Sequence, residues 1–226
     1  MSAKDSLVEV NNNGAFVRSE SLFREVISQD HPMFKPEANR YHLFVAMACP
    51  WANRCLTVLN LRGLDSIIDI SIVHPTWNKT RLDDEHKGWC FVQDPTINFT
   101  SSSGHGSFNT NGCTADKVNG FRTIRDIYEQ NDFYGPKFTV PILYDTHTKK
   151  IVNNESSEII RILNSSFNEW SNNKIDLCPK DLQNQIDDTN NWIYHDINNG
   201  VYKCGFAQSQ EAYGNIYYYY YYYSYY

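Results

Sequence analysis

The chain has 226 residues, of which 41% are hydrophobic and 20% are charged, and its formal net charge is −6. This length is sufficient for one or two domains with a sizeable core, and the acidic balance argues against a nucleic-acid-binding protein, which would need clustered Lys and Arg. No apolar run approaches the length of a membrane span, and the N-terminus resembles neither a secretory signal nor a mitochondrial presequence, so we expect a cytoplasmic protein without a membrane partner.

The chain combines predicted strands and helices, after a polar stretch at 1–40 that we interpret as an N-terminal extension. Pro50 suits the first position of a helix, and Gly63 suits the position after its last turn. In chain order, the predicted elements are one or two helical turns at 21–27, a strand at 41–48, a helix at 50–62, a strand at 67–73, a helix at 118–128, strands at 138–144 and 150–152, and helices at 155–163 and 182–201.

The order of these elements is typical of an α/β thioredoxin-like domain, which we place at 41–165 with a long, polar insertion at 76–119. The apolar spacing within 182–201 indicates the start of an all-α domain at 178–213. Nine of the last ten residues are tyrosine, so we interpret 214–226 as a low-complexity tail outside the fold.

Cys49 stands between the first predicted strand and the first predicted helix, directly before Pro50. At such a position, unpaired backbone N–H groups and the positive end of the helix dipole favour a thiolate. Ala52 occupies the place where a dithiol oxidoreductase would have a second cysteine, so disulfide chemistry would need an outside thiol. The alternative is an inert cysteine buried at a strand end, and we expect Cys55 to be such a core residue.

The other cysteines are scattered without any Cys-x-x-Cys pair, and no histidine pair has the spacing of zinc ligands. We therefore expect no metal site. In a reducing compartment, six such cysteines are expected to be single thiols rather than disulfides.

Two later features suit an extended ligand. A cis bond between Val140 and Pro141 would turn the backbone of Thr139 and Val140 toward a ligand, although a proline in an edge strand explains the pattern equally well. Glu155 and Ser156 begin a predicted helix, where free amides and a hydroxyl suit a carboxylate and Glu155 suits an ammonium group, although simple capping explains them nearly as well. A linear ligand with a thiol, a backbone, a carboxylate and an ammonium is glutathione.

Five stretches form a specific combination over residues 12–213: YHLFVAMACPWANR, the Gly88-Trp89 pair, KFTVPILYD, IVNNESSEIIRILN and DDTNNWIYHDINNGVYKCGFA. With them, the sequence resembles the glutathionyl-hydroquinone reductases, which are Xi-class relatives of the omega glutathione transferases. The resemblance implies a thioredoxin-like domain followed by an all-α glutathione-transferase domain, in a family whose members usually form homodimers.

The resemblance also implies roles for particular residues. Cys49 would be the nucleophile, and Tyr202 the proton donor or acceptor. The residues implied to hold glutathione are Trp89, Lys137, Phe138, Thr139, Val140, Glu155 and Ser156. The implied reaction is the glutathione-dependent reduction of small aromatic glutathionyl-hydroquinones through a cysteine–glutathione mixed disulfide, with glutathione as co-substrate. Two alternatives stay open: an omega-like thiol transferase or dehydroascorbate reductase, and an inactive glutathione-binding chain.

The sequence departs from the family pattern in two places. Asn53 stands where the family usually has histidine, and since Asn cannot carry a positive charge, we expect different tuning of the thiolate. The resemblance stops near Tyr213, so we expect only the start of the helical domain here. Much of the aromatic-substrate pocket and of the dimer surface would then be missing from this sequence.

Overall fold

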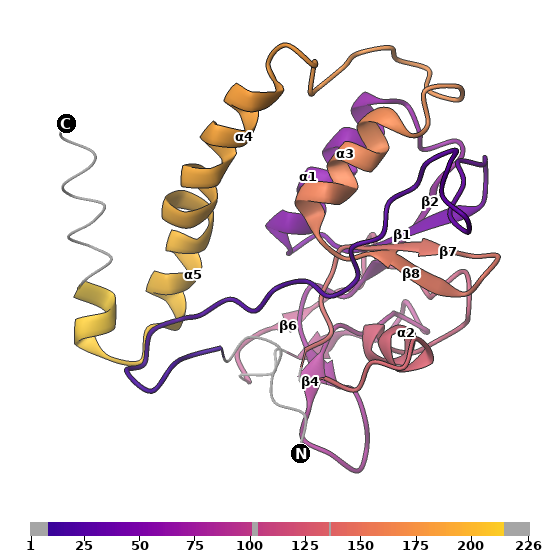
Figure 1. Cartoon of the computed structure of the whole chain (residues 1–226). Coiled ribbons are helices and arrows are strands. Elements are labelled where there is room, and N and C mark those ends of the chain that lie inside the picture. Colours follow the sequence, from indigo (N-terminus) through magenta and orange to yellow (C-terminus); the bar gives the residue numbers. More distant parts are fainter. Residues whose placement is uncertain (1–8, 101–103, 136, 215–226) are drawn as a thin grey trace. The chain divides into compact units, whose positions relative to one another are not determined.

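A computed structural model of the chain describes residues 9–100, 104–135 and 137–214 (Figure 1). These residues divide into two compact units, one formed by 21–177 and the other by 9–20 together with 178–214. The stretch that the sequence suggests as an N-terminal extension is therefore shared between the two units.

The first unit is built on a four-stranded sheet in the order β2–β1–β7–β8. Strand β1 (Tyr41–Ala46) pairs in parallel with β2 (Asp69–Val73) and antiparallel with β7 (Ile142–Asp145). Strand β8 (Lys150–Asn153) then pairs antiparallel with β7. Every residue of β1 is buried, as expected for a central strand that is covered on both faces.

Helices cover both faces of this sheet (Figure 1). α1 (Pro50–Leu61) and α3 (Ser156–Ser165) pack against each other on one face, whereas α2 (Ile124–Gln130) lies on the other side. As predicted, α1 begins at a proline and ends just before Gly63, whose φ of 62° is the left-handed conformation that glycine adopts readily. The buried side chains of α1 and α3 form one core with β1.

Residues 21–27 do not form the predicted helical turns. Arg24 forms a backbone bridge with Asn153 of β8, and the N–H of Glu25 donates to the carbonyl of Val152 at 3.0 Å. The prediction is wrong because the backbone groups of this segment pair with the outer side of β8 rather than with each other.

The insertion at 76–119 contains local structure of its own. Its elements are the pairs β3 (Asn78–Lys79) with β4 (Lys87–Gly88) and β5 (Phe99–Thr100) with β6 (Ser107–Phe108). Near its end, the N–H of Thr114 donates to the carbonyl of Ile72 at 2.8 Å, and the Thr114 hydroxyl accepts from the N–H of Ile72. The insertion therefore returns to the outer side of β2.

Two predicted elements begin several residues later in the structure. The helix predicted from residue 118 begins only at Ile124, because the carboxylate of Asp116 accepts three backbone N–H groups between residues 118 and 121 and holds them in a turn. The strand predicted from residue 138 begins at Ile142, after an irregular stretch that contains Pro141.

In the second unit, α4 (Gln183–Trp192), a π-helical segment η1 (Ile193–Asn198) and α5 (Asn199–Phe206) follow one another without a break. This corresponds to the single helix predicted over 182–201, but the π-helical segment shifts the phase of its apolar stripe. Trp192 and Val201 are 52% and 69% exposed.

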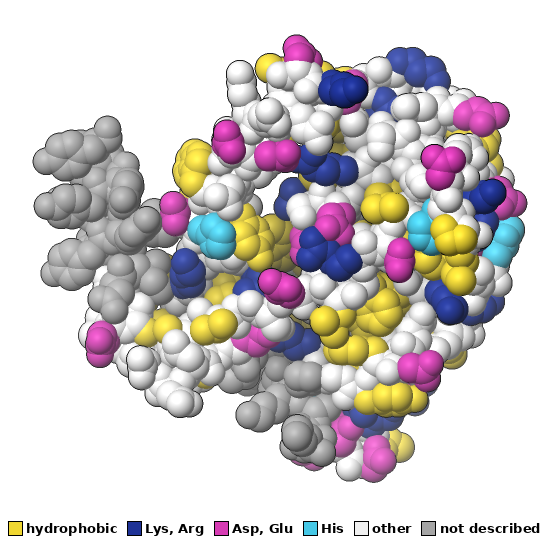
Figure 2. Space-filling view, in the orientation of Figure 1, with side chains coloured by type: hydrophobic (Ala, Val, Ile, Leu, Met, Phe, Trp, Pro, Cys, Tyr) yellow, Lys and Arg dark blue, Asp and Glu magenta, His cyan; other side chains and the backbone are white. Residues whose placement is uncertain are grey.

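The described part of the chain contains no helix that is long and apolar enough to span a bilayer. Within the same residues, there is no group of three or more His, Cys, Asp and Glu side chains arranged to hold a metal ion. Figure 2 shows acidic and basic side chains interspersed over the visible face, rather than collected into regions of one sign.

Candidate functional site

Cys49 is the N-cap of α1, with extended backbone angles and Pro50 in the first turn. Its carbonyl accepts the N–H groups of Ala52 and Asn53 at 3.1 and 3.0 Å. The side chain is 9% exposed, and its Sγ lies 3.4 Å from the carbonyl oxygen of Val140, to which the thiol donates. The structure thus places this sulfur at the start of a helix, beside the segment that precedes Pro141.

The neighbouring cysteines differ from Cys49 in their surroundings. Cys55 is fully buried, as the sequence predicts for a core residue, and burial raises the pKa of its thiol far above the ordinary range. Burial also raises the pKa of Cys90 to about 11. These two thiols are therefore protonated near neutral pH and are poor nucleophiles.

The peptide bond between Val140 and Pro141 is cis, which is the first of the two alternatives that the sequence leaves open. Two residues earlier, Phe138 is buried and contacts two polar side chains. The ring of His86 meets the Phe138 ring edge-on with centroids 5.1 Å apart, and the guanidinium of Arg125 lies 5.6 Å from the same ring centroid. These contacts hold the segment that leads to Val140 in place.

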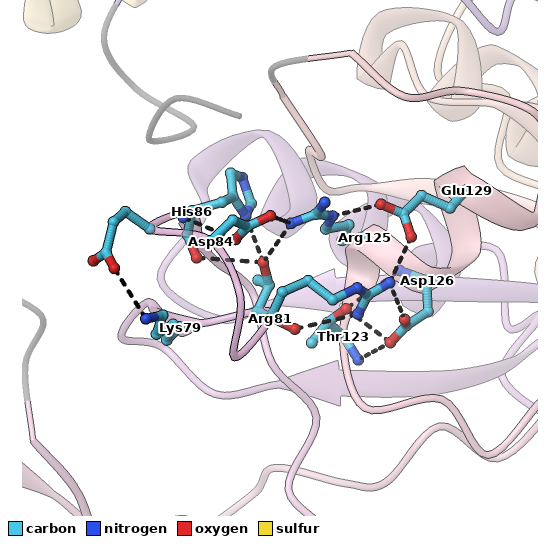
Figure 3. A network of polar contacts seen from close by, with 10 residues as sticks. Lys79, Arg81, Asp84, His86, Thr123, Arg125, Asp126 and Glu129 are labelled. Atoms are coloured by element: carbon cyan, nitrogen blue, oxygen red, sulfur yellow. Dashed lines mark hydrogen bonds and ion pairs between the residues drawn. The ribbon is translucent and has the colours of Figure 1, made fainter. Parts of the chain in front are cut away.

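A network of ion pairs holds α2 against the insertion (Figure 3). Arg125 pairs with Glu129 on the next turn of α2 and with Asp84 of the insertion. Arg81 of the insertion reaches back to Asp126 and Glu129 on α2. These side chains are all partly buried, so we expect the network to contribute more to stability than isolated surface ion pairs would.

Two further residues of the predicted site are Trp89, in the insertion, and Lys137, before β7. Trp89 is half-buried and meets Trp77 edge-on, with ring centroids 5.5 Å apart. Its carbonyl accepts the N–H of Ile124 at 3.0 Å, which ties it to the first residue of α2. Lys137 is also half-buried and directly precedes the aromatic residue at 138.

Glu155 is the N-cap of α3. The Glu155 carboxylate accepts from the backbone N–H and the hydroxyl of Ser157 at 3.1 and 2.9 Å, and from the hydroxyl of Ser21 at 2.9 Å. Ser156 is 3% exposed, and its carbonyl accepts from the thiol of Cys55 at 3.8 Å. The beginning of α3 is thereby linked to α1.

Tyr202 lies on α5 in the second unit. Its ring stacks on Phe16 with centroids 5.8 Å apart, and the guanidinium of Arg18 lies 4.3 Å from its ring centroid. Arg18 also donates through Nε to the side-chain oxygen of Asn199 at 2.7 Å. These contacts describe the surroundings of Tyr202 within its own unit, and its catalytic role stays a prediction.

The sequence does not reveal the side chains that hydrogen-bond to the predicted site residues or to their neighbours. Ser21 bonds to Glu155, and the hydroxyl of Tyr128 bonds to both Thr139 and Asn154. A lone serine in a polar segment carries no detectable signal. Tyr128 is visible only as an apolar position of a predicted helix, because its partners lie far along the chain.

The family model for the glutathione S-transferase N-terminal domain matches residues 48–166, which is more than half of the chain. The chain belongs to the glutathione S-transferase family. The match begins one residue before Cys49 and ends one residue after α3, so it covers the helix starts that carry most of the predicted site.

Similar proteins place this glutathione S-transferase in the Xi-class, omega-like group. A glutathione S-transferase omega-like 2 from Saccharomyces cerevisiae is 42% identical over 89% of this chain and 61% of its own length. A glutathionyl-hydroquinone reductase from Escherichia coli is 38% identical over 90% of this chain and 58% of its own length. The chain thus spans less than two thirds of the length of these relatives.

Solved structures of Xi-class glutathione transferases share the fold. The enzyme from Phanerochaete chrysosporium superposes with a TM-score of 0.81 at 38% identity, over 95% of this chain and 63% of that one. A Saccharomyces cerevisiae enzyme in complex with glutathione gives 0.77 at 41% identity, over 90% of this chain and 62% of that one. The predicted fold class, a thioredoxin-like domain followed by the start of a helical domain, is confirmed.

Proposed function

We propose that this glutathione transferase reduces S-glutathionyl-hydroquinones to hydroquinones, with Cys49 as the nucleophile and glutathione as co-substrate. The observation that carries the proposal is the place of the Cys49 sulfur, at the first turn of α1 and 3.4 Å from the carbonyl of Val140. Amides at a helix start stabilise a thiolate, and the backbone N–H and C=O groups of the segment beside it can pair with a peptide-like ligand.

Glutathione would lie across the segments that precede β7 and begin α3. The N–H and C=O of Val140 would pair with the backbone of its cysteinyl residue, as in strand addition. A ligand carboxylate suits the N–H groups at the start of α3, next to Ser156. The Glu155 carboxylate already accepts three hydrogen bonds, and carboxylates have about four acceptor positions, so one remains for a ligand ammonium.

The proposed reaction consists of two successive nucleophilic attacks on sulfur. The Cys49 thiolate attacks the glutathione sulfur of the conjugate, the bond between sulfur and the aromatic carbon breaks, and its electron pair stays on that carbon. The carbon takes a proton, for which Tyr202 is the proposed donor, and the hydroquinone leaves. A second glutathione thiolate then attacks the mixed disulfide, which releases oxidised glutathione and restores the Cys49 thiolate.

The relatives support this proposal by their names. The Escherichia coli relative is a glutathionyl-hydroquinone reductase, and the Saccharomyces cerevisiae structure is a complex with glutathione. Asn53 in place of the usual histidine is compatible with the chemistry, because its side chain donates to the carbonyl of Met47 at 2.9 Å and thereby supports the turn before Cys49.

The test is the turnover of a synthetic glutathionyl-hydroquinone with mass analysis of the intact protein. We expect a transient mass gain of one glutathione at Cys49, hydroquinone as product, and loss of both in Cys49→Ala. The matched control is Cys90→Ala, which removes a thiol that is protonated at neutral pH and should leave turnover unchanged. Turnover by Cys49→Ala would rule this mechanism out.

Two specific observations favour other candidates. The Saccharomyces cerevisiae relative has the name omega-like, which favours a thiol transferase that shares the attack by Cys49. Faster turnover of a small glutathionylated disulfide than of the glutathionyl-hydroquinone would select that activity. The exposed Trp192 and Val201 favour an inactive glutathione-binding chain, for which binding of an apolar dye without any turnover would be the evidence.

A further inference from the structure

The hydroxyl of Tyr128 joins two segments that are distant in the sequence. Tyr128 lies on α2 and is 1% exposed. Its hydroxyl lies 3.1 Å from the carbonyl oxygen of Thr139, 3.1 Å from the hydroxyl of Thr139 and 2.9 Å from the amide nitrogen of Asn154. These partners directly precede Val140 and Glu155, which belong to the two segments of the proposed glutathione site.

The direction of each hydrogen bond follows from the chemistry of the groups. A tyrosine hydroxyl has one hydrogen to donate and can accept two. The carbonyl of Thr139 can only accept, so the Tyr128 hydrogen belongs to that bond. The Thr139 hydroxyl and the Asn154 amide must then both donate to the Tyr128 oxygen. The one donor and two acceptor positions of this buried hydroxyl are therefore all used. Moving the hydroxyl would break hydrogen bonds that buried groups cannot replace with water.

The bond to Thr139 determines the orientation of a backbone group at the site. A trans peptide is planar, so its N–H points away from its C=O. When Tyr128 holds the carbonyl of Thr139, the N–H of Val140 in the same plane is turned away from α2. The next carbonyl, that of Val140, accepts from the Cys49 thiol. The Tyr128 hydroxyl thus fixes the orientation of the peptide whose N–H would donate a hydrogen bond to the ligand.

The bond to Asn154 acts on the second segment. The side-chain oxygen of Asn154 accepts the backbone N–H of Phe23 at 3.2 Å. The backbone N–H of Asn154 donates to the carbonyl of Phe23 at 3.0 Å. Asn154 is therefore held on two sides, by residue 23 and by Tyr128. This fixes the residue that precedes the N-cap of α3.

We propose that Tyr128 is a positioning residue, which holds the Thr139–Val140 and Glu155–Ser156 segments at the spacing that glutathione requires. The inference rests on the proposed function only in taking these segments as the glutathione site. Tyr128 does not touch the ligand in this proposal, and its effect passes through Thr139 and Asn154.

The substitution Tyr128→Phe isolates the hydroxyl. The Tyr128 ring is enclosed by three aromatic rings with centroids 5.4 to 5.7 Å away, namely those of Phe23, Phe133 and Phe138, and phenylalanine keeps this packing. Tyr144→Phe is the matched control. Tyr144 is also fully buried and its hydroxyl is hydrogen-bonded to side chains, at 2.6 Å to Gln130, but it bonds to neither segment of the site.

The first measurement is calorimetric titration of glutathione into the 226-residue chain and the two variants. We expect Tyr128→Phe to bind glutathione about five- to tenfold more weakly, as the loss of one well-formed buried hydroxyl predicts. Tyr144→Phe should bind like the parent chain, while both variants lose a similar amount of thermal stability. Equal affinity of Tyr128→Phe and Tyr144→Phe would overturn the inference and leave the proposed function standing.

The second measurement compares two reactions of Cys49 in each variant. Oxidised glutathione must be bound in register to react with the thiol, whereas iodoacetamide needs only access to it. We expect the ratio of the two rates to fall about five- to tenfold in Tyr128→Phe and to stay constant in Tyr144→Phe. A constant ratio in both variants would contradict a positioning role.

Further outcomes separate the two proposals. If the parent chain binds no glutathione, the proposed function fails and this inference falls with it. If Tyr128→Phe does not fold, Asn154→Ala removes one of the three hydrogen bonds of the Tyr128 hydroxyl, together with the bond from the Phe23 N–H, and should weaken glutathione binding about two- to fivefold. Unchanged affinity in Asn154→Ala would then overturn the inference.

Discussion

His42 gives the chain a pH-dependent stability that can be measured quantitatively. The side chain lies on β1, is 3% exposed, and places its Nε2 2.9 Å from the hydroxyl of Ser71. Burial lowers the pKa of His42 from 6.5 to about 4, and the more distant charges of Asp69 and Asp116 offset only part of this shift. The folded chain therefore keeps His42 neutral at mildly acidic pH.

The sign of the effect follows from proton uptake by the unfolded chain. Between pH 6.5 and about 4, His42 is protonated in the unfolded state and neutral in the folded state. Above pH 6.5 His42 is neutral in both states and does not reduce the free energy of unfolding. As the pH is lowered through this window, the free energy of unfolding falls. For these two pKa values, lowering the pH from about 7.5 to about 5 costs about 2 kcal/mol.

The assay is urea denaturation at both pH values with the parent chain and with His42→Gln. Glutamine does not titrate, and its amide nitrogen can reach the place of Nε2 and keep the bond to Ser71. We expect the stability of the parent chain to fall by about 2 kcal/mol more than that of the variant. Other groups titrate equally in both chains, so an identical fall in both would refute the reasoning.

Three further predictions concern the fold and the candidate nucleophile. Asp145 is fully buried and accepts two hydrogen bonds from Arg40, so Asp145→Asn should lower the free energy of unfolding by about 3 kcal/mol in urea denaturation, and a loss near zero would contradict the buried pair. Gly63 has a φ of 62°, so Gly63→Ala should cost about 1–2 kcal/mol, and an unchanged melting temperature would argue against this conformation. Iodoacetamide at neutral pH should modify Cys49 before Cys90, whose pKa is about 11, as peptide mapping can show, and equal labelling would speak against an activated thiol.

The sequence predicts those parts of the fold that depend on local chemistry. Pro50 and Gly63 bracket α1 because their backbone preferences act within a few residues. The place of Cys49 at the helix start follows from the same signals. The buried run of β1 is also readable, since a central strand needs apolar residues on both faces.

The parts that could not be predicted depend on partners far along the chain. The apolar pattern at 21–27 suggests a helix, but the exposed backbone of β8 offers it a better set of hydrogen bonds. In the sequence, Tyr128 is an ordinary apolar position of a helix, and only the folded chain brings Thr139 and Asn154 to its hydroxyl. The N-cap of α3 is Glu155, whose carboxylate accepts the N–H of residue 157, although serine is the more usual N-cap residue.

The two segments that flank the sheet have a consequence for solubility. Thr114 pairs with the outer side of β2, and Glu25 pairs with the outer side of β8. A strand with open hydrogen-bonding groups along one side can recruit another chain and begin aggregation. Because both outer strands are covered by segments of the same chain, the sheet is guarded against such growth. Removal of either cover should make the protein prone to assemble edge to edge.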